Sequence, residues 1–308
     1  MTLGILCPGQ GDQYPGMFDL LRNEPAARPA LDALADILDC DPQGLPPDVL
    51  HVNAVAQPVV CAVEMAMFAV LRDRIDAPSI FAGYSVGELA AYGCAGAIEF
   101  ADVLTLARTR ATLMDTACTQ PNGMMAVRGL AQETIADFCS RVDCFIAIVN
   151  GQDRFIVGGL VESLYEFERI AITAGAKITP LKIAVASHTP LMAAASARFR
   201  TILAECVWKT PSAPILAGIS GAAIRQRSSA IDALSNQIDH RLNWQACLVA
   251  LIEHGCTALL ELGPGSSLSR MAQECFPHIS TRSCSDFTSI DGIADWVSRA
   301  SREEDGRR

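Results

Sequence analysis

Short apolar runs that end in glycine-rich turns alternate with helical patterns along much of the chain. Residues 2–7 form the first run and lead into the turn "PGQGDQ", and residues 78–85, "PSIFAGYS", repeat this arrangement. Residues 86–117 then show the apolar spacing of helices, and residues 257–275 contain the same succession again. Because a strand, a tight turn and a helix in series form the unit of a parallel sheet, we expect a large α/β domain with a parallel sheet.

Residues 123–187 have a different texture. Their pattern predicts a strand, a helix, a hairpin of two strands, a second helix and a last strand. In chain order these are residues 123–129, 131–142, 144–150 with 154–159, 161–175 and 176–187. The order βαββαβ is that of the ferredoxin-like split unit. We therefore predict a large α/β domain made of residues 1–122 and 188–308, and a small ferredoxin-like (α+β) domain inserted at residues 123–187.

Composition narrows the possible partners and locations. Half of the residues are hydrophobic and 19% are charged, enough apolar material for a proper core. The net charge of −10 argues against a nucleic-acid partner or an anionic membrane surface, because either needs a concentrated field of Lys and Arg. The first residues lack the pattern of a signal peptide, and no stretch approaches the ~20 apolar residues that span a bilayer. We expect a cytoplasmic protein.

The cysteines suggest no redox or metal chemistry. The 12 cysteines are scattered from Cys7 to Cys284 without a C-x-x-C pair. Most should be small hydrophobic residues of the core, and we expect no metal site.

Ser85 is a candidate nucleophile. The segment "GYSVG" fits the pattern G-x-S-x-G, in which a serine sits on a sharp turn between a strand and a helix. The glycines let neighbouring backbone approach, and the amides at the start of the helix point toward a developing oxyanion. The alternative is a hydroxyl in an ordinary turn, and the pattern alone is weak.

A serine needs a base within hydrogen-bond reach, and the chain offers five histidines. His188 in "VASHTPLM" lies where the small domain is expected to return to the large one, a junction that favours a cleft. A surface or satisfied core histidine is the alternative interpretation.

Two further glycine-rich turns follow predicted strands. In "PGQGDQ" the amide of Gln10 is a candidate oxyanion donor beside that of Val86, although an ordinary turn would have the same composition. The other, "ELGPGSSL", lacks the lysine and the spacing of a phosphate-binding loop, which favours a structural turn.

The ordered blocks together resemble the malonyl-CoA:acyl carrier protein transacylase family. "CPGQGDQYPGM" is similar to the F-P-G-Q-G-x-Q opening of that family, and "GYSVGELAAYGCAGAIEFADVL" is similar to its G-H-S-x-G-E segment. Later blocks of the family correspond to "RTRATLM", "NGMMAV", "SHTPLM", "QIDHRLNW" and "LELGPGSSL". The resemblance spans residues 3–271 and implies an α/β-hydrolase-like core with a ferredoxin-like insert.

The resemblance also implies roles for single residues. The nucleophile of the family falls on Ser85, its base on His188, and its oxyanion amides on Gln10 and Val86. The residue whose backbone carbonyl orients the histidine falls on Gln237.

Arg110 corresponds to the arginine that pairs with the malonyl carboxylate. A buried guanidinium would select malonyl over acetyl thioesters, because a charge left unpaired in a buried site is costly. The alternative is a solvated helix arginine, the interpretation that we give to Arg108.

The implied reaction passes through a malonyl-serine. Malonyl-CoA is the substrate, and the acceptor is the prosthetic-group thiol of an acyl carrier protein; no bound cofactor is implied.

Tyr84 departs from the family pattern, which has histidine before the nucleophile. A tyrosine here resembles the epsilon subunit of malonate decarboxylase, which implies that other subunits of that system are possible partners. Ser187 matches the malonyl-specific enzymes, whereas "VASH" is also similar to polyketide acyltransferases that use α-branched extenders. We place Tyr84 and Ser187 in the substrate-binding part of the site.

Four interpretations stay open on the sequence alone. The chain is either the epsilon subunit of malonate decarboxylase or a malonyl transacylase of fatty acid or polyketide synthesis. A serine hydrolase or thioesterase is an alternative of another class, and a catalytically silent docking subunit is the fourth.

Overall fold

The computed structural model describes residues 2–305 and contains two β-sheets. The larger sheet has the strand order β11-β10-β1-β2-β7-β8, and it is parallel except for the pair β7 and β8. Its strands are β1 (Leu3–Cys7), β2 (Ile80–Gly83), β7 (Ile215–Leu216), β8 (Ala223–Ile224), β10 (Ala258–Glu261) and β11 (Ser280–Ser283). The chain therefore has an α/β fold with mixed sheets, and the predicted parallel sheet is present.

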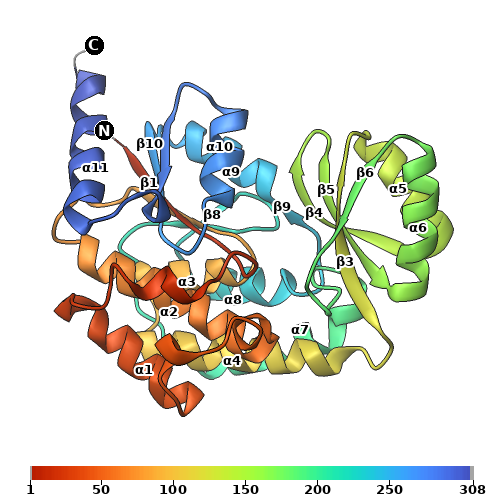
Figure 1. The fold of residues 1–308 in the computed structure, drawn as a ribbon, viewed down its shortest axis with the longest axis horizontal. Helices are drawn as coiled ribbons and strands as arrows, with labels where there is room; N and C mark the ends of the chain where they lie inside the picture. The colour runs from red at the N-terminus through yellow and green to blue at the C-terminus, as the bar shows by residue number, and fades with distance from the viewer. Residues whose placement is uncertain (1, 306–308) are drawn as a thin grey trace.

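Helices enclose the larger sheet (Figure 1). They are α1 (Arg28–Leu38), α2 (Asn53–Leu71), α3 (Val86–Cys94), α4 (Phe100–Ala117), α7 (Ala193–Glu205), α8 (Arg227–Asn236), α9 (Trp244–Glu253), α10 (Ser267–Cys275) and α11 (Ile290–Asp305). The central strands β1, β2 and β10 are buried along their whole length. This explains their continuous apolar runs, because a parallel strand covered on both faces needs no polar side.

The smaller sheet forms a separate lobe at the right of Figure 1, and its helices lie on the side that faces away from the larger part. Its strand order is β6-β3-β5-β4-β9. Its elements are β3 (Asn122–Arg128), α5 (Gln132–Val142), β4 (Cys144–Gly151), β5 (Arg154–Leu160), α6 (Val161–Thr173), β6 (Lys177–Pro180) and β9 (Leu242–Asn243). From residue 122 to residue 180 the predicted order βαββαβ is therefore present.

Two details of this lobe differ from the prediction. The last strand was expected over residues 176–187, but β6 ends at Pro180, and residues 181–187 form no strand. The sheet also takes its edge strand β9 from outside residues 123–187, and β9 pairs in parallel with β4. The division of the chain at residues 122/123 and 187/188 stays a prediction.

The side chains of β3 alternate between two cores. Met125 and Val127 pack with α5 and α6, whereas Met124 belongs to the cluster that faces the larger part of the molecule. The period of two along a strand produces this division. As a result, one face of the smaller sheet presents an apolar surface to the rest of the protein.

Helix α2 corrects one expectation from the sequence. Within the described chain, it is the one helix that is long and apolar enough to cross a membrane by length and composition. Of its apolar stretch, 89% is buried inside the protein. The helix packs against α1, α3 and α4, and a helix covered on nearly all sides is apolar all round.

One charged side chain of α2 lies in this core. Glu64 is 0% exposed, and neither of its carboxyl oxygens has a hydrogen-bond partner. Burial, reinforced by Cys7 and Glu261, raises the pKa of Glu64 well above its ordinary value. The folded protein therefore keeps this carboxyl protonated at a pH where the unfolded chain releases the proton.

Glu64→Gln should stabilise the protein by an amount that grows with pH. Because folding raises the pKa of Glu64, the free energy of unfolding is highest below the ordinary pKa of 4.5 and falls as pH rises above it. The loss is ~1.4 kcal/mol per pH unit until the folded pKa is reached. Urea unfolding at several pH values between about 5 and 7 measures the difference. The exposed Glu253→Gln is the matched control, and a Glu64→Gln difference that is constant with pH would contradict the argument.

Candidate active site

Ser85 occupies a strained turn between β2 and α3. Its backbone angles are φ 56° and ψ −120°, a combination that non-glycine residues rarely adopt. A Cβ on Gly83 would lie 2.1 Å from the Glu88 amide nitrogen, and one on Gly87 would lie 2.1 Å from the Cys7 carbonyl oxygen. Both glycines are therefore required for the close packing of strand, turn and helix. Such strain costs on the order of 1–3 kcal/mol and persists where the surrounding structure enforces it.

His188 lies beside Ser85, as the sequence predicts. The distance from Ser85 Oγ to His188 Nε2 is 2.9 Å, and His188 Nδ1 contacts the backbone carbonyl oxygen of Gln237. Because a carbonyl oxygen only accepts, Nδ1 carries the proton and Nε2 is free to accept one from Ser85. The backbone amide of His188 donates to the Ile238 carbonyl oxygen at 2.8 Å, which fixes the backbone that carries the ring.

The pKa of His188 is lowered to about 3. Burial is the main cause, and the charge of Arg110 is the second, while the hydrogen bond to Gln237 opposes both. The imidazole is therefore neutral over the physiological range, the form that can accept a proton.

Arg110 of α4 reaches into the same site. The side chain is 2% exposed, with Nη2 3.3 Å from Ser85 Oγ and Nη1 donating to Gln57 Oε1 at 2.7 Å. Burial lowers the pKa of Arg110 to about 10, and Cys61 and Glu88 oppose this shift. Arg110 therefore remains cationic at neutral pH. Arg108, by contrast, is exposed, in agreement with the prediction.

Sequence reasoning missed two residues of this network. Gln57 of α2 accepts from Arg110, and Glu88 of α3 accepts from the Gln237 side chain at 3.1 Å and from the Gly218 amide at 2.9 Å. Burial raises the pKa of Glu88 to about 8, and the Gly218 amide and Arg110 oppose the rise. A polar residue inside the apolar run of α2 was the signal for Gln57, and the position next to "GYSVG" was the signal for Glu88.

Gln10 lies on the loop that follows β1, and this loop is brought beside Ser85 by strand pairing. Cys7 pairs with Gly83 across β1 and β2, and the Tyr84 amide donates to the Cys7 carbonyl at 2.9 Å. Gly9 packs closely against Tyr84, where a Cβ would meet the carbonyl oxygen at 2.9 Å.

Gln10 and Val86 offer free amides near Ser85. Within the described chain, the backbone amides of both residues have no hydrogen-bond acceptor. They are therefore available to an external oxygen, as an oxyanion site requires.

Tyr84 connects the nucleophile turn to the smaller sheet. Its ring packs edge-to-face on Trp244 with a centroid distance of 5.4 Å, and its hydroxyl lies beside the side chain of Asn150 of β4. Burial raises the pKa of the phenol, so it stays neutral. Ser187 is also buried, one residue before His188.

Six of the eight predicted residues line one cavity of about 440 Å³ between the two sheets, whereas Val86 and Gln237 do not line it. The polar end contains Ser85, His188, Arg110, Gln10 and Gln57, and Tyr84 and Ser187 also line the wall. The opposite wall is apolar and comes largely from the smaller sheet and the segment after it: Met124, Ile148, Ile156, Leu181 and Ile183. His51, which no local pattern had marked, lines the cavity as well. In the described part of the chain, no group of three or more His, Cys, Asp or Glu residues is placed to hold a metal ion.

Comparison with known sequences gives a consistent result. The family model of the acyl transferase domain matches residues 5–290. A malonyl CoA-acyl carrier protein transacylase of Mycobacterium tuberculosis is 31% identical over 306 residues, which cover 95% of this chain and 99% of the relative. The corresponding protein of Haemophilus influenzae is 26% identical over 307 residues, covering 95% and 98%.

Solved structures agree in fold. An acyl-carrier-protein S-malonyltransferase from Burkholderia pseudomallei has a TM-score of 0.90 at 29% identity, covering 96% of this chain and 100% of that one. A malonyl-transacylase in complex with its type II PKS acyl-carrier protein has a TM-score of 0.91 at 26% identity, covering 96% and 99%.

Arg110→Met should raise the pKa of His188. The substitution removes the positive charge that is the second cause of the low value, while burial and the Gln237 contact stay in place. Titration of the isotope-labelled imidazole by NMR measures the change. Arg108→Met, two positions away on the exposed side of α4, is the matched control and should leave the titration unchanged. Equal titration curves for Arg110→Met and wild type would refute the assignment of the charge effect.

Proposed function

The chain belongs to the acyl transferase family, and we propose that it transfers a malonyl group from malonyl-CoA to the prosthetic-group thiol of an acyl carrier protein through a malonyl-serine at Ser85. The matching relatives are malonyl transacylases, and one related structure is a complex with an acyl-carrier protein. The acyltransferase class follows from the family itself.

The observation that supports malonyl as the acyl group is the buried cation beside the nucleophile. Arg110 Nη2 lies 3.3 Å from Ser85 Oγ, and its protein partners at this end are neutral oxygens of Gln57, Gln237 and Ser85. A carboxylate held here would replace neutral acceptors with an opposite charge in a site with little water. An acetyl thioester has no carboxylate, so the guanidinium would keep only its neutral partners and gain no ion pair.

The first half-reaction forms the acyl-enzyme. His188 Nε2 takes the proton of Ser85 as Oγ attacks the thioester carbon, and the amides of Gln10 and Val86 hold the resulting oxyanion. The carbon–sulfur bond then breaks, and the CoA thiolate leaves with the proton from His188. No bound cofactor is required, since the chain supplies the nucleophile, the base and the oxyanion donors.

The second half-reaction reverses these steps with the carrier thiol as the nucleophile. His188 takes the proton of the thiol, the sulfur attacks the malonyl-serine, and Ser85 recovers the proton. Water must be excluded while the ester waits, and the apolar wall of Met124, Ile148 and Ile156 is suited to this.

Substrate binding would also strengthen the base. Arg110 is one of the causes of the low pKa of His188, and a malonyl carboxylate would neutralise that charge. The pKa of His188 would then rise toward its ordinary value when the correct acyl group is bound. Selection for malonyl would therefore act on the rate of attack as well as on binding.

Within this activity we assign the chain to the malonate decarboxylase system as its epsilon subunit, because Tyr84 replaces the usual histidine. Transfer in fatty acid or polyketide synthesis is the second candidate, and the names of the relatives favour it. We also regard the larger part as α/β-hydrolase-like and the small lobe as ferredoxin-like, in line with the strand order β6-β3-β5-β4.

Incubation with malonyl-CoA should give a stable malonyl adduct on Ser85, detected by intact mass and peptide mapping. Ser85→Ala should form no adduct and lose several orders of magnitude of transfer rate, because nucleophile and base act as a unit. Rapid release of free malonate without transfer would instead indicate a hydrolase. Arg110→Ala should lose most of the preference for malonyl-CoA over acetyl-CoA, whereas Arg108→Ala should keep it.

The physiological acceptor can be tested by competition. The purified enzyme is charged with labelled malonyl and offered equal amounts of two carriers, one from malonate decarboxylase and one from fatty acid synthesis. We expect at least about tenfold faster transfer to the former, the usual scale of partner discrimination by a few contacts. Equal rates, or a preference for the fatty acid carrier, would reject the decarboxylase assignment. Tyr84→His tests whether this residue contributes to that choice.

A further inference from the structure

Helix α10 connects the larger sheet to the candidate oxyanion loop. Its residues Ser267, Leu268 and Met271 line the cavity beside Ser85. The helix follows β10 after a short loop that contains Gly265, and this is the turn that the sequence left as structural. The proposed reaction assigns no role to it.

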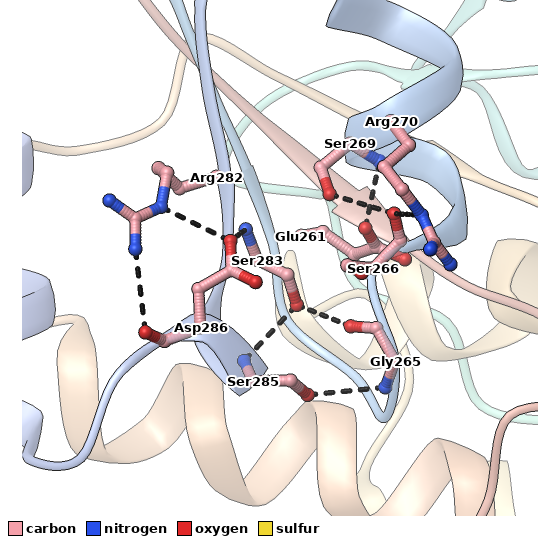
Figure 2. Close-up of polar contacts among 9 residues, drawn as sticks. All are labelled: Glu261, Gly265, Ser266, Ser269, Arg270, Arg282, Ser283, Ser285 and Asp286. Carbon is pink, nitrogen blue, oxygen red and sulfur yellow. Dashed lines mark hydrogen bonds and ion pairs between the residues drawn. The ribbon is translucent and has the colours of Figure 1, made fainter.

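Glu261, the last residue of β10, holds the first turn of α10. It is 0% exposed, and its Oε2 accepts the Ser269 amide at 2.8 Å (Figure 2). Its Oε1 accepts the Leu268 amide at 3.2 Å. A carboxylate at the N-terminus of a helix accepts hydrogen bonds from the free amides there and interacts favourably with the positive end of the helix dipole. Both carboxyl oxygens are thus occupied as acceptors.

The first turn of α10 is in turn tied to the loop that contains Gln10. Ser267 Oγ donates to Asp12 Oδ2 at 2.5 Å, and a Cβ on Gly265 would lie 2.5 Å from Asp12 Cβ. Gly265 has φ +83°, so this close approach requires glycine. Its amide donates to Ser285 Oγ at 3.1 Å and its carbonyl accepts from Ser283, contacts that Figure 2 shows.

We propose that Glu261 is a positioning residue for the acyl transfer: in its ionised form it holds α10, and through Ser267 and Asp12 it holds the Gln10 amide toward Ser85. The inference rests on the proposed function. Asp12 is two residues from Gln10, and the Gly11 amide between them is fixed by Gln13 Oε1 at 2.6 Å. A shift of α10 would therefore reach the oxyanion donor through the contact between Ser267 and Asp12.

Glu261 changes its protonation state near neutral pH. Burial raises its pKa to about 7, with a further rise from Asp12, while hydrogen bonds from Ser269 and Leu268 oppose the shift. The ionisable groups that face it are Asp12 after β1, Cys7 of β1, Glu64 of α2 and Cys284 after β11. On protonation one oxygen becomes a hydroxyl, which no longer accepts as a carboxylate oxygen does. The hold on α10 therefore weakens below about pH 7.

The pH range alone separates Glu261 from His188 but not from Glu88. The pKa of His188 is near 3, so its protonation lies far below. Glu88, with a pKa of about 8, is nearer, but it contacts Gln237 and Gly218 rather than α10. A substitution at position 261 therefore decides between them.

The test is the rate of Ser85 acylation by malonyl-CoA in a single turnover, from pH ~5.5 to ~9. The wild-type rate should fall about a hundredfold as pH drops through the pKa of Glu261, the scale expected for a misplaced oxyanion donor. Glu261→Gln should show a low rate without this midpoint. Asp41→Asn, which alters a remote cap on the Gln43 amide, is the control and should match wild type.

A second readout excludes a merely structural role. Because the pKa of Glu261 is raised on folding, its contribution to stability is full below its ordinary value of 4.5 and is lost as pH rises through about 7. The free energy of unfolding of wild type should therefore fall relative to that of Glu261→Gln as pH rises. Over the same range the wild-type acylation rate should increase. A structural defect would move both in the same direction.

Two further measurements keep the outcome decisive. Ser267→Ala keeps the Glu261 contacts but breaks the link to Asp12, so it should lower the rate and remove the midpoint even if Glu261→Gln fails to fold. A serine-reactive fluorophosphonate, which also uses the oxyanion amides, reports the same pH profile without malonyl-CoA. If malonyl-CoA gives no adduct while the fluorophosphonate profile persists, the proposed function fails and the role of Glu261 stands. Wild-type profiles in Ser267→Ala or Glu261→Gln would overturn the inference.

Discussion

The buried positive charge of Arg110 is the constraint around which the site is organised. The guanidinium is 2% exposed and its hydrogen-bond partners are the oxygens of Gln57, Gln237 and Ser85, so no carboxylate of the described chain is ion-paired with it. A buried cation with neutral partners retains a strong attraction for an anion. The same charge helps to keep His188 neutral, and this links recognition of a carboxylate to the strength of the base.

The two sheets make different contributions to the cavity around this charge. The loops after β1 and β2 of the larger sheet supply Gln10 and Ser85, because parallel strands leave their loops at one edge, and the covering helices α2 and α4 supply Gln57 and Arg110. The smaller sheet supplies the apolar wall of Met124, Ile148 and Ile156. Contacts between the two parts hold the wall in place. The Tyr84 hydroxyl lies beside the Asn150 side chain of β4, and the Ala186 amide donates to Asn122 Oδ1 at 2.6 Å, two residues before His188.

Local patterns predicted the elements that are defined by short stretches of chain. The strands around "PGQGDQ" and "AGYS" and the order βαββαβ follow from apolar runs and turns, and the structure contains them. The pattern failed where local propensity did not decide. Residues 181–187 are apolar enough for a strand but leave the sheet to bring His188 to Ser85, and β9 joins the smaller sheet from a distant part of the chain.

The sequence by itself determined the nucleophile turn and the identity of its main partners. Gly83, Ser85 and Gly87 lie within five positions, so this short stretch of sequence meets the steric requirements of the strand, the turn and the helix. The resemblance to the family identified His188, Arg110 and Gln237, but it did not indicate which residues surround them. Only the tertiary structure decided that Gln57 and Glu88 join them, that Glu261 holds α10, and that burial shifts these pKa values. Burial and contacts between residues far apart in sequence depend on how the helices pack, and no local pattern encodes that.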